Sequence, residues 1–125
     1  MIRYIDTPGY EVVAELSDDS FIISCADDVP DILGELGMNN CNRIIIHERN
    51  LHKNFFNLST RIAGHILQKF SNYRVRLAIV GDFSKYPGKS FNDFMRESNR
   101  GNLVFFAGDS GSAFQKLAES KVCSG

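Results

Sequence analysis

Between Arg43 and Val80 the hydrophobic and polar positions follow two patterns in turn. Arg43–His47 and residues 75–80 are short apolar runs rich in β-branched residues, which is typical of strands covered on both faces. Between these runs, apolar residues recur at helical spacing and polar residues occupy the opposite side. The apolar positions are Leu58, Ile62, Ile66, Leu67 and Phe70. The pattern predicts a strand, a helix capped by Ser59, and a second strand parallel to the first.

The amino-terminal part favours a hairpin. Ile2–Ile5 and residues 11–16 flank the turn sequence Asp6-Thr7-Pro8-Gly9, in which Pro sets one dihedral and Gly permits the next. Residues 21–24 could add a short strand. Asp27 or Asp28 is then placed to cap a first helix with apolar positions at helical spacing. These positions are Val29, Ile32, Leu33 and Leu36.

The carboxyl-terminal part repeats the order of helix and strand. A polar loop over residues 81–89 precedes a helix that ends at Gly101, followed by a strand over 103–106. A last helix contains Ala113, Phe114 and Leu117, and residues 120–125 are expected to form a flexible tail. We therefore expect one α/β domain over residues 1–125, with a mixed sheet of four to five strands and about four helices.

Composition narrows the classes of function. The chain has 125 residues, is 43% hydrophobic and has a formal net charge of −1, which suits one compact core. The absence of a Lys/Arg cluster argues against a nucleic-acid partner. Three cysteines, Cys25, Cys41 and Cys123, show no disulfide or zinc spacing, so a reducing cytoplasm is expected. The amino terminus lacks a signal peptide pattern and no apolar run is long enough to span a membrane.

Candidate chemistry gathers where the two central strands end. His47 and Glu48 close the first strand, and Asp82, Ser84 and Lys85 follow the second, so in a parallel sheet they should lie side by side. His47 and Glu48 are candidates for an acid and a base, with Asp82 orienting a substrate. His47 and His52 are five residues apart, which does not match a helical zinc motif, and no metal site or cofactor is expected.

Hydroxyl groups at the start of the central helix are a second candidate site. Ser59 and Thr60 lie where a side-chain oxygen can cap a helix and where an added phosphate is electrostatically favoured. Together with Ser84 they are candidates for a ligand-binding or switch role.

Several stretches of the chain resemble known families. Arg43-Ile44-Ile45-Ile46, Phe55 to Thr60, Ala63 to Leu67 and Leu77 to Gly81 are similar to the STAS domain of bacterial anti-sigma-factor antagonists. The runs Ile45 to Glu48, Ala63 to Phe70 and Leu77 to Ser84 resemble a bacterial family known only as domain of unknown function four-one-eight-zero. The resemblance implies a STAS-like fold and no assigned activity. It also implies that Ser59 or Thr60 occupies the position at which the antagonists are phosphorylated, with Arg61 where their motif has Gly.

Two hypotheses follow. The first is a small regulatory module, not an enzyme, that binds a protein partner or a small ligand and is switched by a charge change at Ser59 or Thr60. The alternative is a small enzyme that uses His47, Glu48 and Asp82. An exposed hairpin edge would also permit a homodimer.

Overall fold

The structure, a computed structural model, describes residues 2–6, 12–86 and 88–119, and its strands form one mixed sheet. The sheet order is β1-β2-β3-β4-β5; β1 is antiparallel to β2, and the other neighbours are parallel. The strands are β1 (Ile2–Ile5), β2 (Val13–Leu16), β3 (Arg43–His47), β4 (Arg76–Val80) and β5 (Val104–Ala107). The expected α/β class is confirmed, with five strands and four helices in the described ranges.

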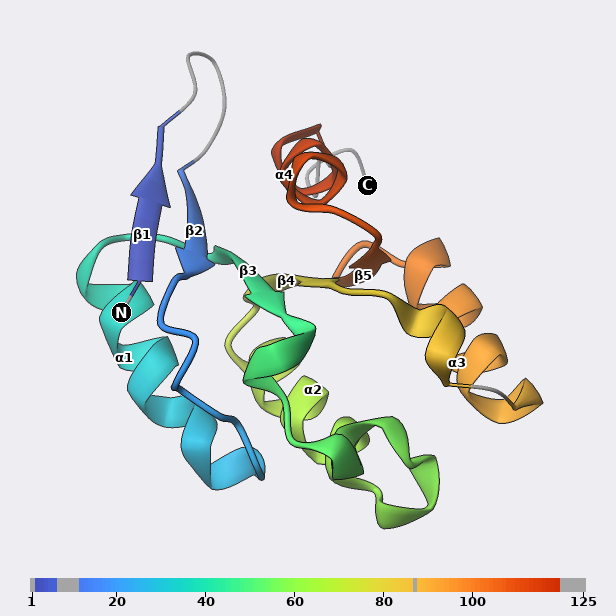
Figure 1. Ribbon diagram of the computed structural model, residues 1–125. Helices are drawn as coiled ribbons and strands as arrows, with labels where there is room; N and C mark the ends of the chain where they lie inside the picture. Colours follow the sequence, from blue (N-terminus) through green and yellow to red (C-terminus); the bar gives the residue numbers. More distant parts are fainter. Residues whose placement is uncertain (1, 7–11, 87, 120–125) are drawn as a thin grey trace.

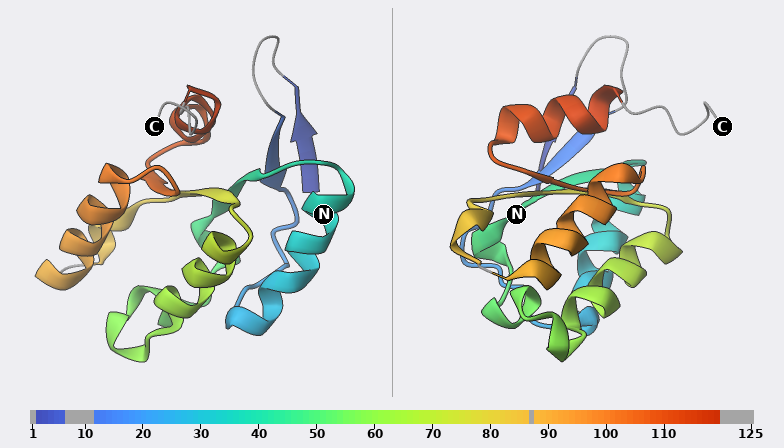
Figure 2. Two further views of the ribbon diagram at one scale, coloured as in Figure 1. Left: turned by 180° about the vertical axis from the view of Figure 1, so that it is seen from behind. Right: turned by 90° about the vertical axis from the view of Figure 1, so that its right-hand side faces the viewer.

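The helices cover both faces of this sheet unequally. In Figures 1 and 2 the helix nearest the carboxyl terminus covers one face of the sheet, and the other helices cover the opposite face. The other helices are α1 (Val29–Met38), α2 (Ile62–Asn72) and α3 (Lys89–Arg100), and the helix nearest the carboxyl terminus is α4 (Ser110–Glu119). With helices on both sides, the central strands are buried on both faces, which explains their continuous apolar runs.

Alternation along β3 supplies both hydrophobic cores. Ile44 and Ile46 belong to the large cluster that includes buried side chains of α1 and α2. Ile45 belongs to a smaller cluster with Ala113 and Leu117 of α4. Successive strand residues point to opposite faces, so each isoleucine of this run is 1% exposed or less.

An arginine at the start of β3 holds the end of α4 on the sheet. Arg43 is 8% exposed, and its Nη1 donates a hydrogen bond to the carbonyl oxygen of Leu117 at 2.5 Å. Carbonyl groups at the carboxyl end of a helix carry partial negative charge and favour a cation. The contact therefore joins two residues 74 positions apart in the chain.

Three local expectations need qualification. Residues 21–24 form no strand: one bridge joins Ile23 to Leu51. Asp28 is the N-cap residue of α1, but its carboxylate accepts from the backbone amides of Ser24 and Cys25 rather than from the helix. The predicted hairpin pairing is present as β1 and β2, whereas its turn and residues 120–125 lie outside the described residues.

Candidate functional site

The carboxyl end of β3 separates His47 from Glu48. His47 is the last strand residue and has the same direction as Ile45, toward the face covered by α4. Glu48 begins a 3-10 turn, Glu48–Asn50, in which Asn50 Oδ1 accepts from the backbone amide of His47 at 3.2 Å. No hydrogen bond joins His47 to Glu48 or to Asp82 within the described ranges. The expected acid and base therefore have separate surroundings.

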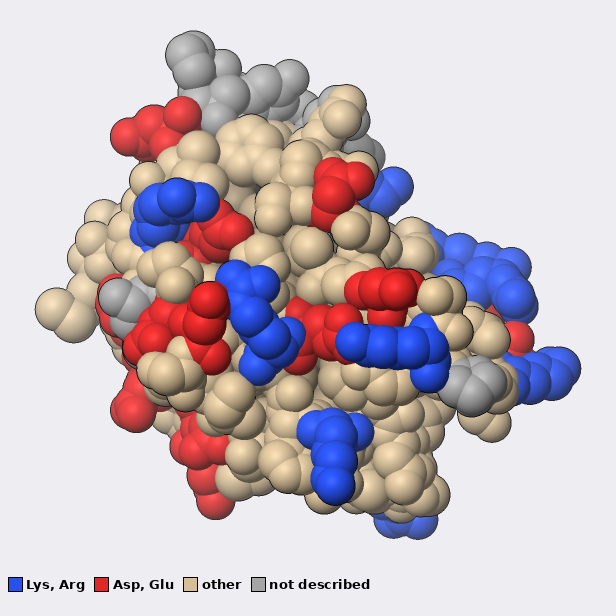
Figure 3. Space-filling model, viewed as in Figure 1, with Lys and Arg blue, Asp and Glu red and all other residues tan. Residues whose placement is uncertain are grey.

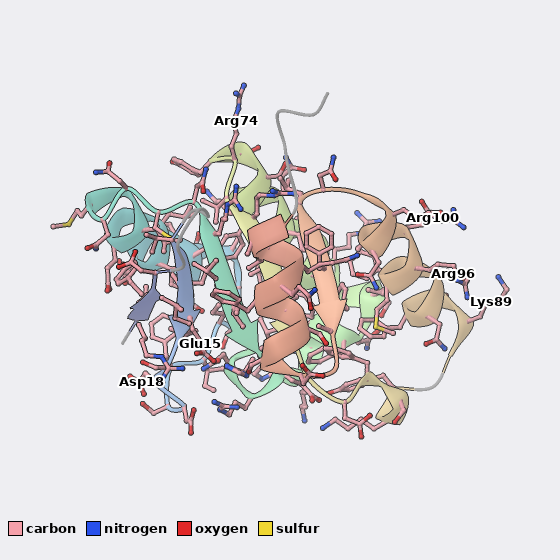
Figure 4. All side chains as sticks on the ribbon, turned by 90° about the horizontal axis from the view of Figure 1, so that it is seen from above. Glu15, Asp18, Arg74, Lys89, Arg96 and Arg100 are labelled. Atoms are coloured by element: carbon pink, nitrogen blue, oxygen red, sulfur yellow. The ribbon has the colours of Figure 1, made fainter. Side chains whose placement is uncertain are left out.

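His47 is the partner of a glutamate on the neighbouring strand. Its Nε2 lies 2.7 Å from Glu15 Oε2, and both side chains are 10% exposed. The other oxygen of Glu15 pairs with Arg3 of β1, whose side chain is 65% exposed. Burial raises the pKa of Glu15, but the hydrogen bonds from His47 and Arg3 outweigh this effect and lower the pKa below its ordinary value. Figure 4 shows Glu15 among the strands seen from the α4 side.

Glu48 instead holds the loop that follows β4. Its Oε2 is 2.7 Å from Lys85 Nζ and also accepts a hydrogen bond from the hydroxyl of Tyr86. Its Oε1 accepts from the backbone amide of Asp82 at 3.3 Å. Burial, the hydrogen bond to Glu48 and the negative charge of Glu48 all raise the pKa of Tyr86. Glu48 therefore has three partners in the loop and is a structural anchor.

Gly81 provides the space that Glu48 occupies. A Cβ atom at position 81 would lie 2.6 Å from Glu48 Cβ and 2.7 Å from Glu48 Oε1. Real side chains do not approach so closely, so either residue 81 has no side chain or Glu48 must move. The glycine that ends β4 is thus a packing requirement of the Glu48 anchor.

Asp82 and Ser84 form a compact turn of their own. Asp82 Oδ1 accepts from the backbone amide of Ser84 at 3.1 Å and from its hydroxyl at 2.6 Å. These two hydrogen bonds lower the pKa of Asp82, followed in size by opposing desolvation and the charge of Lys85. The carboxylate therefore has its partner within the turn Phe83–Lys85.

Ser59 does not cap the central helix, contrary to the expectation. The chain makes a 3-10 turn over Leu58–Thr60, and the N-cap residue of α2 is Arg61, which makes no side-chain cap hydrogen bond. Arg61 has φ 63°, in the left-handed region, so the helix starts two residues later than expected. Ser59 is exposed, and its hydroxyl donates to Asn57 Oδ1 at 2.7 Å. Thr60 Oγ1 accepts from the amide of Ile62 at 3.2 Å.

A hollow separates this turn from the start of α3. Its volume is about 360 Å³, and its lining comes from two segments of the chain: Phe56, Asn57, Leu58 and Ser59, and Gly88, Lys89, Ser90 and Phe91. The N-cap residue of α3 is Gly88, which has no side chain that could accept a hydrogen bond from the first-turn amides. The amino end of a helix bears partial positive charge, so this wall of the hollow favours an anion.

Aromatic packing fixes the walls of this hollow. Phe56 stacks on Tyr86 with ring centroids 4.3 Å apart. It also meets Phe91 of α3 edge to face at 5.7 Å. Phe56 belongs to the first lining segment and Phe91 to the second, so their ring contact helps to fix the spacing between the Ser59 turn and α3.

Comparison with known families places the chain in an uncharacterised group. Residues 9–117 match the family model described as "Domain of unknown function (DUF4180)". The chain belongs to this family. No curated protein and no solved structure gives a significant match.

The contacts of this DUF4180 protein include two that sequence reasoning missed. The Glu15–His47 pair depends on the register of β2 beside β3, in which Glu15 is opposite Ile45. A charged residue inside the otherwise apolar strand Val13–Leu16 was the available signal. The Glu48–Tyr86 hydrogen bond had no comparable signal, because it joins residues 38 positions apart across two loops.

The described ranges of this DUF4180 chain show neither a metal site nor a membrane-spanning helix. No group of three or more His, Cys, Asp or Glu side chains there is arranged to hold a metal ion. No described helix has the length and apolar character needed to cross a bilayer.

Proposed function

We propose that this chain is a regulatory binding module and that a negative charge at Ser59 switches its affinity for a protein partner or small ligand. The observation behind the proposal is that the exposed Ser59 turn and the amino end of α3 line the same hollow. A phosphate or an acidic group at this place would lie in the field of the α3 amino end, with Lys89 nearby. Binding at the hollow would then depend on the charge of Ser59.

Comparison of three serines favours Ser59 as the switch. Ser20, Ser59 and Ser84 each donate their hydroxyl to a side-chain oxygen two residues earlier, at 2.6, 2.7 and 2.6 Å respectively. The acceptors of Ser20 and Ser84 are the carboxylates Asp18 and Asp82, whereas the acceptor of Ser59 is the neutral amide Asn57. Like charges at hydrogen-bonding distance repel, so a phosphate is disfavoured at Ser20 and Ser84. Ser59 is free of that penalty.

Thr60 is less suited to this role than its neighbour. Its Oγ1 lies 2.8 Å from the carbonyl oxygens of both Asn54 and Asn57 and also accepts from Ile62. Modification would break these local contacts at the start of α2. Thr60 therefore supports the turn, and Ser59 offers the accessible hydroxyl.

A STAS-like fold is part of the proposal. In the antagonists that the chain resembles, a serine at the start of the corresponding helix is phosphorylated and a glycine follows the serine pair. Arg61 occupies the glycine position here with φ 63°, a conformation that favours glycine. The backbone at Arg61 is thus the one expected if the motif is shared, although the residue differs.

The alternative of an acid–base enzyme would require His47, Glu48 and Asp82 to face one substrate. His47 instead contacts Glu15, Glu48 contacts Lys85 and Tyr86, and Asp82 contacts Ser84. These separate contacts support a binding role over catalysis.

Ser59→Glu tests the proposal, with Ser20→Glu as the matched control because Ser20 lies in the same kind of turn away from the hollow. In amide-resolved NMR spectra, we expect Ser59→Glu to shift the signals of Lys89, Ser90 and Phe91, and Ser20→Glu to leave them unchanged. Quantitative capture from lysate of the source cell should then show a partner whose retention differs between wild type and Ser59→Glu only. Equal behaviour of the two variants in both measurements would refute the switch.

A further inference from the structure

The charges of this chain are strongly divided along the sequence. Residues 12–42 contain seven Asp or Glu side chains and no Lys, Arg or His. Residues 43–119 contain twelve Lys or Arg and six Asp or Glu. The net charge of the chain is close to zero, but residues 12–42 are acidic and residues 43–119 are basic. Each segment can attract a group of opposite charge.

The fold converts this division into two distant surfaces. α1 lies at the β2 side of the sheet and α3 at the β5 side, at opposite ends of the molecule (Figure 1). Figure 3 shows acidic side chains gathered over α1 and basic side chains projecting from α3. The two surfaces cannot contact each other within one copy of the chain.

The acidic surface is the outer side of α1 and its preceding turn. Val29, Ile32 and Leu36 form the buried side of the helix, so Asp31 and Met38 lie on the opposite side. Asp27 and Asp31 are exposed, and the Met38 side chain is 86% exposed. Asp27 and Asp31 lie four residues apart near the start of α1, so this end of the surface suits a basic partner, and the exposed Met38 offers a separate apolar contact at the other end of the helix.

The basic surface is the outer side of α3. Lys89, Arg96 and Arg100 are 89%, 63% and 70% exposed, and Figure 4 shows all three pointing away from the sheet. Asp93 pairs with Lys89 at 2.7 Å and with Arg96 at 3.0 Å, which aligns these two cations along one side of the helix. Three cations and the acidic residues Asp93 and Glu97 leave this surface net positive.

Strand pairing is hindered at the same end of the molecule. β5 is the edge strand, and the backbone amide of Phe106 is already hydrogen-bonded to Asn99 Oδ1 at 2.7 Å. A second chain that added a strand here would have to displace Asn99. The outer side of α3 is therefore the accessible surface at this end.

We propose that the α1 surface of one copy binds the α3 surface of a second copy. The guanidinium groups of Arg96 and Arg100, which are four residues apart on α3, would pair with Asp27 and Asp31, which are also four residues apart. Because one surface is acidic and the other basic, the contact is head-to-tail and depends on ionic strength. Lys89 borders both this surface and the Ser59 hollow, but Arg96 and Arg100, which would pair with α1, do not line the hollow.

Sedimentation velocity on the full chain tests the association. At about 20 mM NaCl, where screening is weak, we expect the weight-average mass to rise with protein concentration, and at about 300 mM NaCl we expect this rise to disappear. Asp27→Lys/Asp31→Lys and Arg96→Glu/Arg100→Glu should each weaken self-association at least tenfold. An equimolar mixture of the two variants should recover it, because each reversed surface then meets a complementary one.

Lys53→Glu/Arg74→Glu is the matched control for Arg96→Glu/Arg100→Glu. It makes the same charge change, and its two residues are exposed but belong to neither surface. It should associate like wild type. If charge reversal disturbs folding by circular dichroism, Asp27→Asn/Asp31→Asn gives the same test with a smaller expected loss. A wild-type chain that stays monomeric at low salt, association unaffected by reversal, or equal loss in the control would each overturn the proposal.

Discussion

His47 Nε2 lies 2.7 Å from Glu15 Oε2, and this contact joins the end of β3 to β2 on the face covered by α4. The two residues are 32 positions apart in the chain. Arg3 extends the arrangement to β1, so that one carboxylate links three strands. Glu15 therefore connects β1, β2 and β3 through its side-chain contacts.

Replacing Glu15 should destabilise the protein more than breaking an exposed ion pair. Glu15→Ala leaves the buried His47 without its hydrogen-bond partner, and a buried polar group left unsatisfied costs about 1–3 kcal/mol. Asp19→Ala is the control, because Asp19 and Arg49 are 70% and 52% exposed and such pairs contribute about 1 kcal/mol or less. Urea unfolding would measure both free energies. A Glu15→Ala cost no greater than that of Asp19→Ala would contradict the structural role.

Acid should weaken the protein through the same residue. The pKa of folded Glu15 is below its ordinary value of 4.5, so its stabilising contribution is complete above that value and is lost as the pH falls through the folded pKa. Unfolding midpoints measured between neutral pH and about pH 3 should decline less steeply for Glu15→Gln than for wild type. Parallel curves for the two proteins would exclude Glu15 as a source of acid sensitivity.

Gly81 and Gly64 should respond to alanine in opposite directions. Gly81→Ala places a Cβ 2.6 Å from Glu48 Cβ, and overpacking of this kind costs about 1–3 kcal/mol. Gly64 lies inside α2 with no atom within 4 Å of an added Cβ, so Gly64→Ala should stabilise by about 0.4–1 kcal/mol. Thermal unfolding would compare the two. Equal effects would show that Glu48 moves away at little cost.

Alkaline pH should destabilise the wild type through Tyr86. The pKa of Tyr86 is raised above its ordinary value of 10.0, so the unfolded chain loses the tyrosine proton first. The contribution is complete below pH 10 and is lost as the pH rises through the folded pKa. Between about pH 8 and pH 11, stability should fall more for wild type than for Tyr86→Phe. At neutral pH, Tyr86→Phe should cost about 1 kcal/mol for the lost hydrogen bond.

The central part of the fold could be predicted from local patterns. Ile44, Ile45 and Ile46 form a strand because β-branched residues suit an extended chain, and their continuous run requires cover on both faces. The helical spacing of Ile62, Ile66 and Phe70 likewise predicts a helix whose apolar side packs on the sheet. In both cases the signal is short-range and repeats several times.

The candidate site was less predictable, because its contacts are single and distant. His47 and Glu48 are adjacent in the sequence, and their side chains nevertheless have partners in different parts of the molecule. The central helix starts later than the predicted cap at Ser59, because Arg61 takes a left-handed conformation. No local sequence pattern predicted that conformation. The hollow beside Ser59 is lined by segments far apart in the chain, whose rings Phe56 and Phe91 contact each other.

Sequence alone determined that this chain is α/β, where its central strands and helices lie, and that polar residues gather beyond β3 and β4. Hydrophobic periodicity encodes these features because apolar residues must be buried on the same side of every helical turn and at regular positions along every strand. Only the tertiary structure decided that His47 binds Glu15, that Glu48 holds the loop after β4 and that Ser59 faces α3. Each of these depends on strand register and loop packing, in which one contact between remote residues has no repeated pattern to reveal it.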